Sequence, residues 1–134
     1  MINVPTYVAN RIVGVTLQNA QGTNLIPFVG LAAGSVITEV DSIIVSSDDT
    51  VERIVEFYYT DNLTNFFMIS TRVPPGAGYN TAPGTPAKSI LEAAAFRFSF
   101  SSGSLKTKAT TPVTAGKTIT VVAHTKEYQG LTTA

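Results

Sequence analysis

The chain has 134 residues, a length that fits one domain with one hydrophobic core. Nine basic and nine acidic residues give a formal net charge of zero, which excludes a long-range field that would draw the chain to nucleic acid or an anionic membrane. Only 13% of the residues are charged, about half of the usual share, and poorly charged surfaces often lie against partners. We therefore expect a protein that packs against other protein subunits.

The absence of cysteine excludes disulfides, thiolate metal sites and thiol nucleophiles. No apolar stretch approaches the length of about 20 residues that spans a membrane. Residues 1–10 lack the basic and then apolar layout of a secretion signal. The sequence predicts a soluble, unprocessed protein with no membrane partner.

The first half of the chain reads as strands and turns. Residues 12–17 form a β-branched run that ends in a polar cluster with a glycine, which indicates a strand and a turn. Residues 24–30 predict a second strand, at an edge or bulged, because Pro27 cannot donate a ladder hydrogen bond. Residues 36–47 predict a central strand, and a turn at 46–50 joins it to residues 51–60, so we expect these two strands to form a hairpin.

Residues 51–60 show a period of two, which predicts one core face and one solvent face. The core face carries apolar side chains, with Arg53 as the exception, and the other face carries two glutamates. After a turn at 61–62, residues 65–73 predict the next strand. Residues 74–86 form a loop rich in proline and glycine, and residues 86–96 alone have helical character, as a short helix or an irregular crossing.

Three further strands are predicted: residues 96–100 with alternating phenylalanines, residues 105–109 and residues 117–128. About eight short strands with turns between them predict an all-β, single-domain antiparallel β-sandwich or jelly roll. Its bounds would be residues 12–128, between an N-terminal arm of residues 1–11 and a flexible C-terminal tail of residues 129–134. A barrel with a similar number of strands is the alternative.

Candidate catalytic and metal-binding residues are few. The sole histidine, His124, lies on the last predicted strand, and no motif surrounds a nucleophile near it, so we expect an ordinary strand or interface residue. The acidic residues between 39 and 52 match no calcium loop, and Asp48 and Asp49 are typical turn residues. We therefore expect a non-enzymatic protein with no metal and no cofactor.

Aromatic residues are the remaining candidates for an interface. Two doublets, Tyr58-Tyr59 and Phe66-Phe67, lie on neighbouring predicted strands, and each must point one ring to each face. They form either an outward patch of the kind enriched in interfaces or a strand buried on both faces. The candidate interface residues are Tyr58, Tyr59, Phe66, Phe67, Tyr79 in the Pro/Gly loop, and His124.

The order of several short motifs resembles that of a known group of proteins. The motifs are Gly34-Ser35 before an Ile/Val strand, Asp49-Thr50-Val51 before the strand at 51–60, the Pro/Gly loop, and the segments 102–106 and 114–123. In this order the chain resembles the small β-sandwich virion proteins of tailed bacteriophages, of the capsid decoration or cement type. The similarity covers residues 12–127, and no catalytic residue accompanies it.

The resemblance implies a protein on the exterior of the virion capsid, assembled in the host cytoplasm, that binds the major capsid protein or other virion subunits and forms a homo-oligomer such as a trimer. Such a protein would stabilise the assembled head by association alone. The expected contact regions are the N-terminal arm, the Pro/Gly loop and the tail.

Two alternative functions stay open. One is a tail, collar or head-to-tail connector component. The other is a carbohydrate-binding module, for which Tyr58, Tyr59, Asp61 and Asn62 would supply the site.

Overall fold

The structure is a computed structural model, and it describes residues 5–32, 34–78, 86–89 and 98–130. Across these ranges the chain forms strands, joined by turns and one short 3-10 helix at Asn19–Gln21, and contains no helix able to cross a membrane. The strands are β1 (Pro5–Leu17), β2 (Ile26–Gly30), β3 (Ile37–Ser47), β4 (Arg53–Thr60), β5 (Asn65–Val73), β6 (Lys88–Ser89), β7 (Phe98–Phe100), β8 (Ser104–Ala109) and β9 (Ile119–Gly130).

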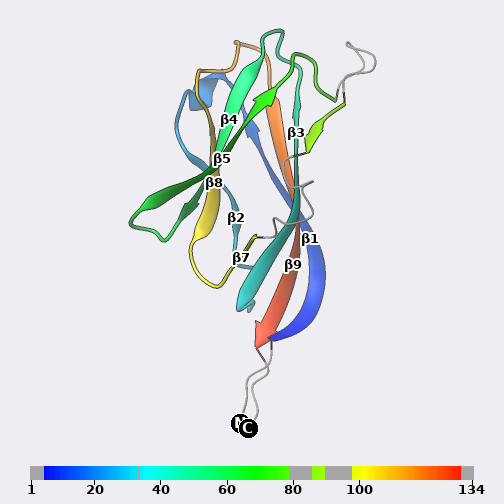
Figure 1. The fold of residues 1–134 in the computed structure, drawn as a ribbon, viewed down its shortest axis with the longest axis vertical. Coiled ribbons are helices and arrows are strands. Elements are labelled where there is room, and N and C mark those ends of the chain that lie inside the picture. The colour runs from blue at the N-terminus through cyan, green and yellow to red at the C-terminus, as the bar shows by residue number, and fades with distance from the viewer. Residues whose placement is uncertain (1–4, 33, 79–85, 90–97, 131–134) are drawn as a thin grey trace.

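The described strands form two antiparallel sheets that pack face to face (Figure 1). Sheet A has the order β1-β9-β3-β6, and β7 also pairs with β3. Sheet B has the order β2-β8-β4-β5. The predicted single-domain β-sandwich is confirmed, and two separate sheets exclude the alternative of one closed barrel.

Alternation along the strands builds the core between the sheets. In β9 every second residue from Ile119 to Glu127 is buried, and the residues between them face outward. β3 contributes alternate buried residues beside β9 in sheet A, and β4 and β8 contribute those of the opposite sheet. The fully buried apolar side chains include Leu17, Val29, Val40, Val45, Val55, Phe57, Val73, Leu105, Val113, Ile119 and Val121.

The ends of the domain differ from the prediction. The first strand begins at Pro5 and pairs with β9 from Pro5 opposite Gly130 to Leu17 opposite Ile119. Residues 5–11 are therefore part of sheet A and not of an arm, because a complementary strand at the C-terminal end pairs with their backbone. Residues 129–130 likewise belong to β9, while residues 1–4 and 131–134 lie outside the described part.

The predicted hairpin of residues 36–60 is wrong, since β3 lies in sheet A and β4 in sheet B. The turn between them crosses the end of the sandwich around buried Asp49, whose carboxylate accepts hydrogen bonds from the amides of Val51 and Thr114. Arg53, the exception on the core face, donates to the same carboxylate at 2.9 Å. Burial raises the pKa of Asp49, but hydrogen bonds from Thr114 and Arg53 outweigh it and hold the pKa far below the ordinary value.

Asp48 also acts as a turn residue, since its carboxylate accepts the amide of Thr118 at 2.7 Å. Asp48 and Asp49 therefore are turn residues, as predicted, and their side chains accept backbone amides.

Two further predictions concern single segments. β2 is an edge strand with a register shift between Pro27 and Val29, as its proline predicts. The segment with helical character is extended where it is described, because Lys88 and Ser89 pair with β3 as strand β6. Residues 90–97 of that segment, and Tyr79 with residues 80–85 of the Pro/Gly loop, lie outside the described residues.

Candidate interaction surfaces

The hairpin of β4 and β5 carries both aromatic doublets. The register places Tyr58 opposite Phe67 and Tyr59 opposite Phe66, so each doublet points one ring to each face, as predicted. The outward rings of Tyr58 and Phe67 meet edge to face at 5.6 Å between centroids, and the ammonium of Lys108 lies 5.5 Å from the Tyr58 ring. Phe66 and Phe67 remain about half exposed, which favours the outward patch over a strand buried on both faces.

The turn between β4 and β5 presents an apolar side chain at its tip. Leu63 is 95% exposed, and the hairpin projects from the body of the sandwich (Figure 1). One oxygen of Asp61 accepts the amides of Leu63 and Thr64 at 2.9 and 2.7 Å, and Asn62 adopts a positive φ of 78°. These bonds fix the turn and lower the pKa of Asp61. We call Leu63, Phe66 and Phe67 the hairpin tip.

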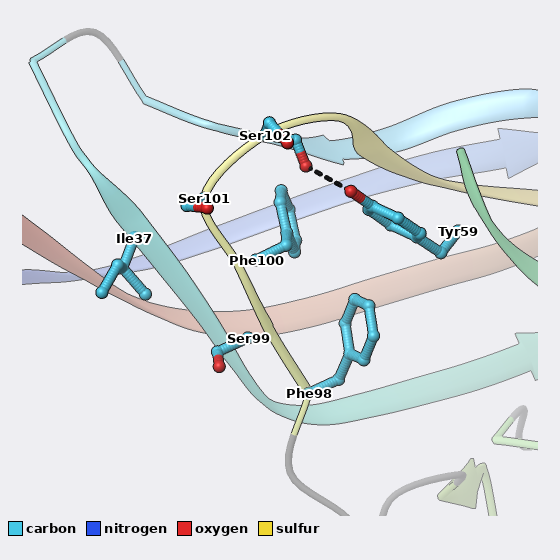
Figure 2. A pocket seen from close by; sticks show the side chains of 7 residues that line it. All are labelled: Ile37, Tyr59, Phe98, Ser99, Phe100, Ser101 and Ser102. Atoms are coloured by element: carbon cyan, nitrogen blue, oxygen red, sulfur yellow. Dashed lines mark hydrogen bonds between the residues drawn. The ribbon is translucent and has the colours of Figure 1, made fainter. Parts of the chain in front are cut away.

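A pocket of about 420 Å³ opens beside Tyr59, near the turn end of this hairpin. Figure 2 shows the rings of Tyr59, Phe98 and Phe100 facing a shared space, with the turn after β7 at its rim. The Tyr59 ring lies 5.6 Å from the Phe98 ring, and its hydroxyl donates to the carbonyl of Ser102 at 2.8 Å. We call this the aromatic pocket; Tyr59 thus lines a pocket and does not join Tyr58 on the outer face.

The outer face of sheet A carries a second apolar surface. The register places Ile12 beside His124, and Gly14 beside Val122, which in turn neighbours Ile44. Ile12 is 75% exposed and Ile44 is 45% exposed, whereas His124 is partly buried. We call Ile12, Ile44, Val122 and His124 the sheet A patch. The only histidine therefore lies on an open sheet face.

The acidic residues lie apart. Asp49 pairs with Arg53, Asp41 with Lys126 at 3.4 Å, and Glu52 with Arg72 on the surface. In the ranges that the structure describes, no three His, Asp or Glu side chains gather as a metal site would require.

Glu127 is a buried carboxylate that the sequence analysis did not single out. It is 4% exposed and accepts hydrogen bonds from the hydroxyls of Thr38 and Thr125 at 2.6 and 3.0 Å. Arg11 lies 3.0 Å from it and also donates to the carbonyl of Gly30. The cluster joins β1, β3 and β9 to the end of β2, and each carboxylate oxygen has a partner, so its role is structural.

The residues that would form a carbohydrate site do not converge. Tyr58 and Tyr59 point to opposite faces of sheet B, because successive residues of a strand alternate. One oxygen of the Asp61 carboxylate accepts two backbone amides of its own turn. The four residues therefore do not face one common site.

Sequence reasoning missed Leu63, Ile12 and the aromatic pocket. Leu63 lies between polar turn residues in the sequence. An isolated leucine in a polar turn cannot face the core, so its position could have indicated an exposed apolar side chain. The pocket gave no such signal, because its residues come from β3, β4, β7 and the turn that follows.

Comparison with models of protein families finds no match to this chain, and comparison with curated proteins finds none either. The geometry of the described residues is therefore the basis of the proposals that follow.

Proposed function

We propose that this chain is a non-enzymatic structural subunit of a tailed bacteriophage virion that binds the exterior of the assembled head and stabilises it. The partner is the major capsid protein or another subunit of the shell. Because the chain binds the intact lattice and not its separated parts, binding at many sites stabilises the shell by mass action. No covalent chemistry is needed for this function.

One observation supports this proposal most: apolar side chains are exposed on two separate surfaces of one small domain. The hairpin tip belongs to sheet B, and the sheet A patch lies on the outer face of the other sheet. A subunit that joins a lattice needs a surface for the shell and a surface for its neighbours. Exposed apolar residues that cluster in this way often mark protein interfaces.

The sheet A patch suits contact with a shell. It spans the neighbouring strands β1, β9 and β3, so its backbone is held by sheet hydrogen bonds and loses little freedom on binding. Three of its four side chains are aliphatic, and His124 is the fourth. We assign the shell contact to this patch.

The test is co-sedimentation of purified chain with heads assembled without it. Ile12→Asp should weaken binding by about 30-fold or more, the loss expected when a central interface side chain is removed. Thr16→Asp is the matched control, since Thr16 is exposed on the same strand and the same face, nearer its end. It should bind within about 3-fold of the unmodified chain.

Both substitutions are at exposed positions, so both variants should unfold at nearly the same temperature as the parent chain. Equal binding of the Ile12→Asp variant and the parent would refute the assignment of the patch. If the chain forms rings and does not bind heads at all, a tail or connector role replaces the decoration role.

A further inference from the structure

The hairpin tip is preorganised for insertion into a cavity. Asp61 holds the amides of Leu63 and Thr64, and the hydroxyl of Thr60 accepts the amide of Asn62 at 3.2 Å. The turn is therefore fixed before any partner binds, and its conformational entropy is not lost on association. A leucine that is 95% exposed on such a turn is an anchor that lacks a receiving pocket in its own copy.

The aromatic pocket has the chemistry to receive such an anchor. Its lining residues are Ile37, Tyr59, Phe98 and Phe100 with Ser99, Ser101 and Ser102. None of them is charged, so no charge must be desolvated on insertion. Its volume of about 420 Å³ falls in the range of pockets that enclose whole small ligands, roughly 300–1,000 Å³, which is enough for one leucine side chain and its neighbours.

The pocket is also held in place relative to the hairpin. Tyr59 belongs to the turn end of β4 and donates its hydroxyl to the carbonyl of Ser102, so the turn after β7 is bonded to the hairpin. Gly103 packs so closely on the carbonyl of Thr60 that a side chain at this position would collide with it. The anchor and the pocket therefore move as one rigid unit.

The anchor and the pocket of one copy do not contact each other, since Leu63 is almost fully exposed and is not among the residues that line the pocket. Tyr59 precedes Thr60, the residue that closes the turn, so the anchor and the pocket lie near the same end of the β4–β5 hairpin. Two or three copies can therefore exchange their turns around a symmetry axis and close the assembly. The formal net charge of zero means that copies do not repel each other at long range.

We propose that Leu63 of one copy inserts into the aromatic pocket of a second copy, and that this contact forms a closed homo-oligomer. The contact joins copies of the chain to one another and does not depend on whether they bind a virion. The contact uses the turn of the β4–β5 hairpin and a pocket lined by β3, β4, β7 and the turn after β7, and it includes no residue of the sheet A patch.

Cross-linking between two different variants tests the contact directly, because the chain has no cysteine of its own. Leu63→Cys and Ser101→Cys are prepared separately, mixed, and treated with a mild oxidant. The mixture should form a disulfide-linked dimer at least about 10-fold faster than a mixture of Leu63→Cys with Ser70→Cys, whose cysteine is exposed on β5 away from the pocket rim. Equal rates in the two mixtures would overturn the proposal.

Sedimentation velocity is the second measurement. The parent chain should self-associate, and Leu63→Asp should raise the dissociation constant by about 30-fold or more, the loss of one hot-spot side chain. Val51→Asp, an equivalent change at a half-exposed position before β4, at the end of that strand opposite to the turn, should leave self-association unchanged. Leu63 is too exposed for its loss to unfold the chain, so equal thermal midpoints will show that both variants are folded.

A parent chain that stays monomeric at high concentration would overturn the proposal, and so would an oligomer that the Leu63→Asp variant forms equally well. A monomeric chain that still binds heads would refute this contact and leave the proposed function standing. An oligomer that is linked through Leu63 but does not bind heads would support this contact and refute the proposed function.

Discussion

The guanidinium of Arg11 in β1 lies 3.0 Å from the carboxylate of Glu127 in β9, which is buried at one end of the sandwich. The two strands pair along almost their whole length, and this ion pair joins their side chains across the core face of sheet A. A buried carboxylate is stabilised only while its partners remain in place. The pair therefore makes residues 5–11 part of the folded domain.

Replacing Glu127 should destabilise the fold strongly. Glu127→Ala leaves the hydroxyls of Thr38 and Thr125 and the guanidinium of Arg11 without their acceptor. We expect a loss of about 3 kcal/mol in the free energy of unfolding, measured by urea denaturation. Glu52→Ala removes an exposed ion pair with Arg72 and should cost less than about 1 kcal/mol. Similar losses for the two variants would contradict the structural role of the buried cluster.

Deleting residues 1–11 should destabilise the domain, whereas removal of a flexible arm would not. The deletion removes Arg11 and the part of β1 that pairs with residues 125–130 of β9. The thermal midpoint should fall by roughly 7 to 11 °C, because about 2 to 3 kcal/mol is lost from a domain of this size. Calorimetry of the truncated chain provides the measurement. An unchanged midpoint would show that the N-terminal segment is an arm after all.

The stability should fall in acid because of Asp49. Its pKa is lower in the folded chain than the ordinary value of 3.8, so the unfolded chain binds a proton first as the pH falls. The contribution of its carboxylate is fully present above about pH 5 and decreases as the pH falls below about 4. Urea denaturation at a series of pH values measures it.

Asp49→Asn is the comparison for this titration. The difference in unfolding free energy between the parent and this variant should be on the order of 3 kcal/mol at pH 7 and should shrink between about pH 4 and pH 2. The other carboxylates, including Asp61, are common to both chains and cancel in the difference. A difference that does not change with pH would show that Asp49 does not titrate below the ordinary range in the folded chain.

Two glycines with the same φ should respond differently to alanine. Gly103 and Gly116 both have φ of 81°, but a side chain at Gly103 would collide with the carbonyl of Thr60, while Gly116 has open space around it. Gly103→Ala should cost about 3 kcal/mol from backbone strain and collision together. Gly116→Ala should cost about 1 kcal/mol from strain alone. Equal thermal midpoints for the two variants would contradict the close packing of the turn on the hairpin.

Much of the fold followed from local patterns in the sequence. The strand at residues 65–73 matches β5 at both ends, because the turn pair at 61–62 and Pro74 bound the segment on both sides. The edge position of β2 followed from Pro27, which has no amide hydrogen to donate. The opposed rings of the aromatic doublets followed from the alternation of strands alone.

The errors arose where distant residues decide the structure. Residues 5–11 become a strand because β9, more than a hundred residues later, pairs with them; no local pattern shows that partner. The chain crosses between sheets after β3 because Asp49 binds Thr114, and a turn sequence alone cannot distinguish a crossing from a hairpin. The aromatic pocket depends on the same kind of long-range packing, as does the burial of Glu127.

The central claim is that the chain binds an assembled head as a structural subunit. Its most direct test is the number of chains bound per head at saturation, measured by titrating purified chain into heads that lack it. The account predicts saturation at a fixed ratio to the major capsid subunit, with bound heads that resist heating or low salt better than bare heads. Absence of saturable binding to such heads would contradict the claim.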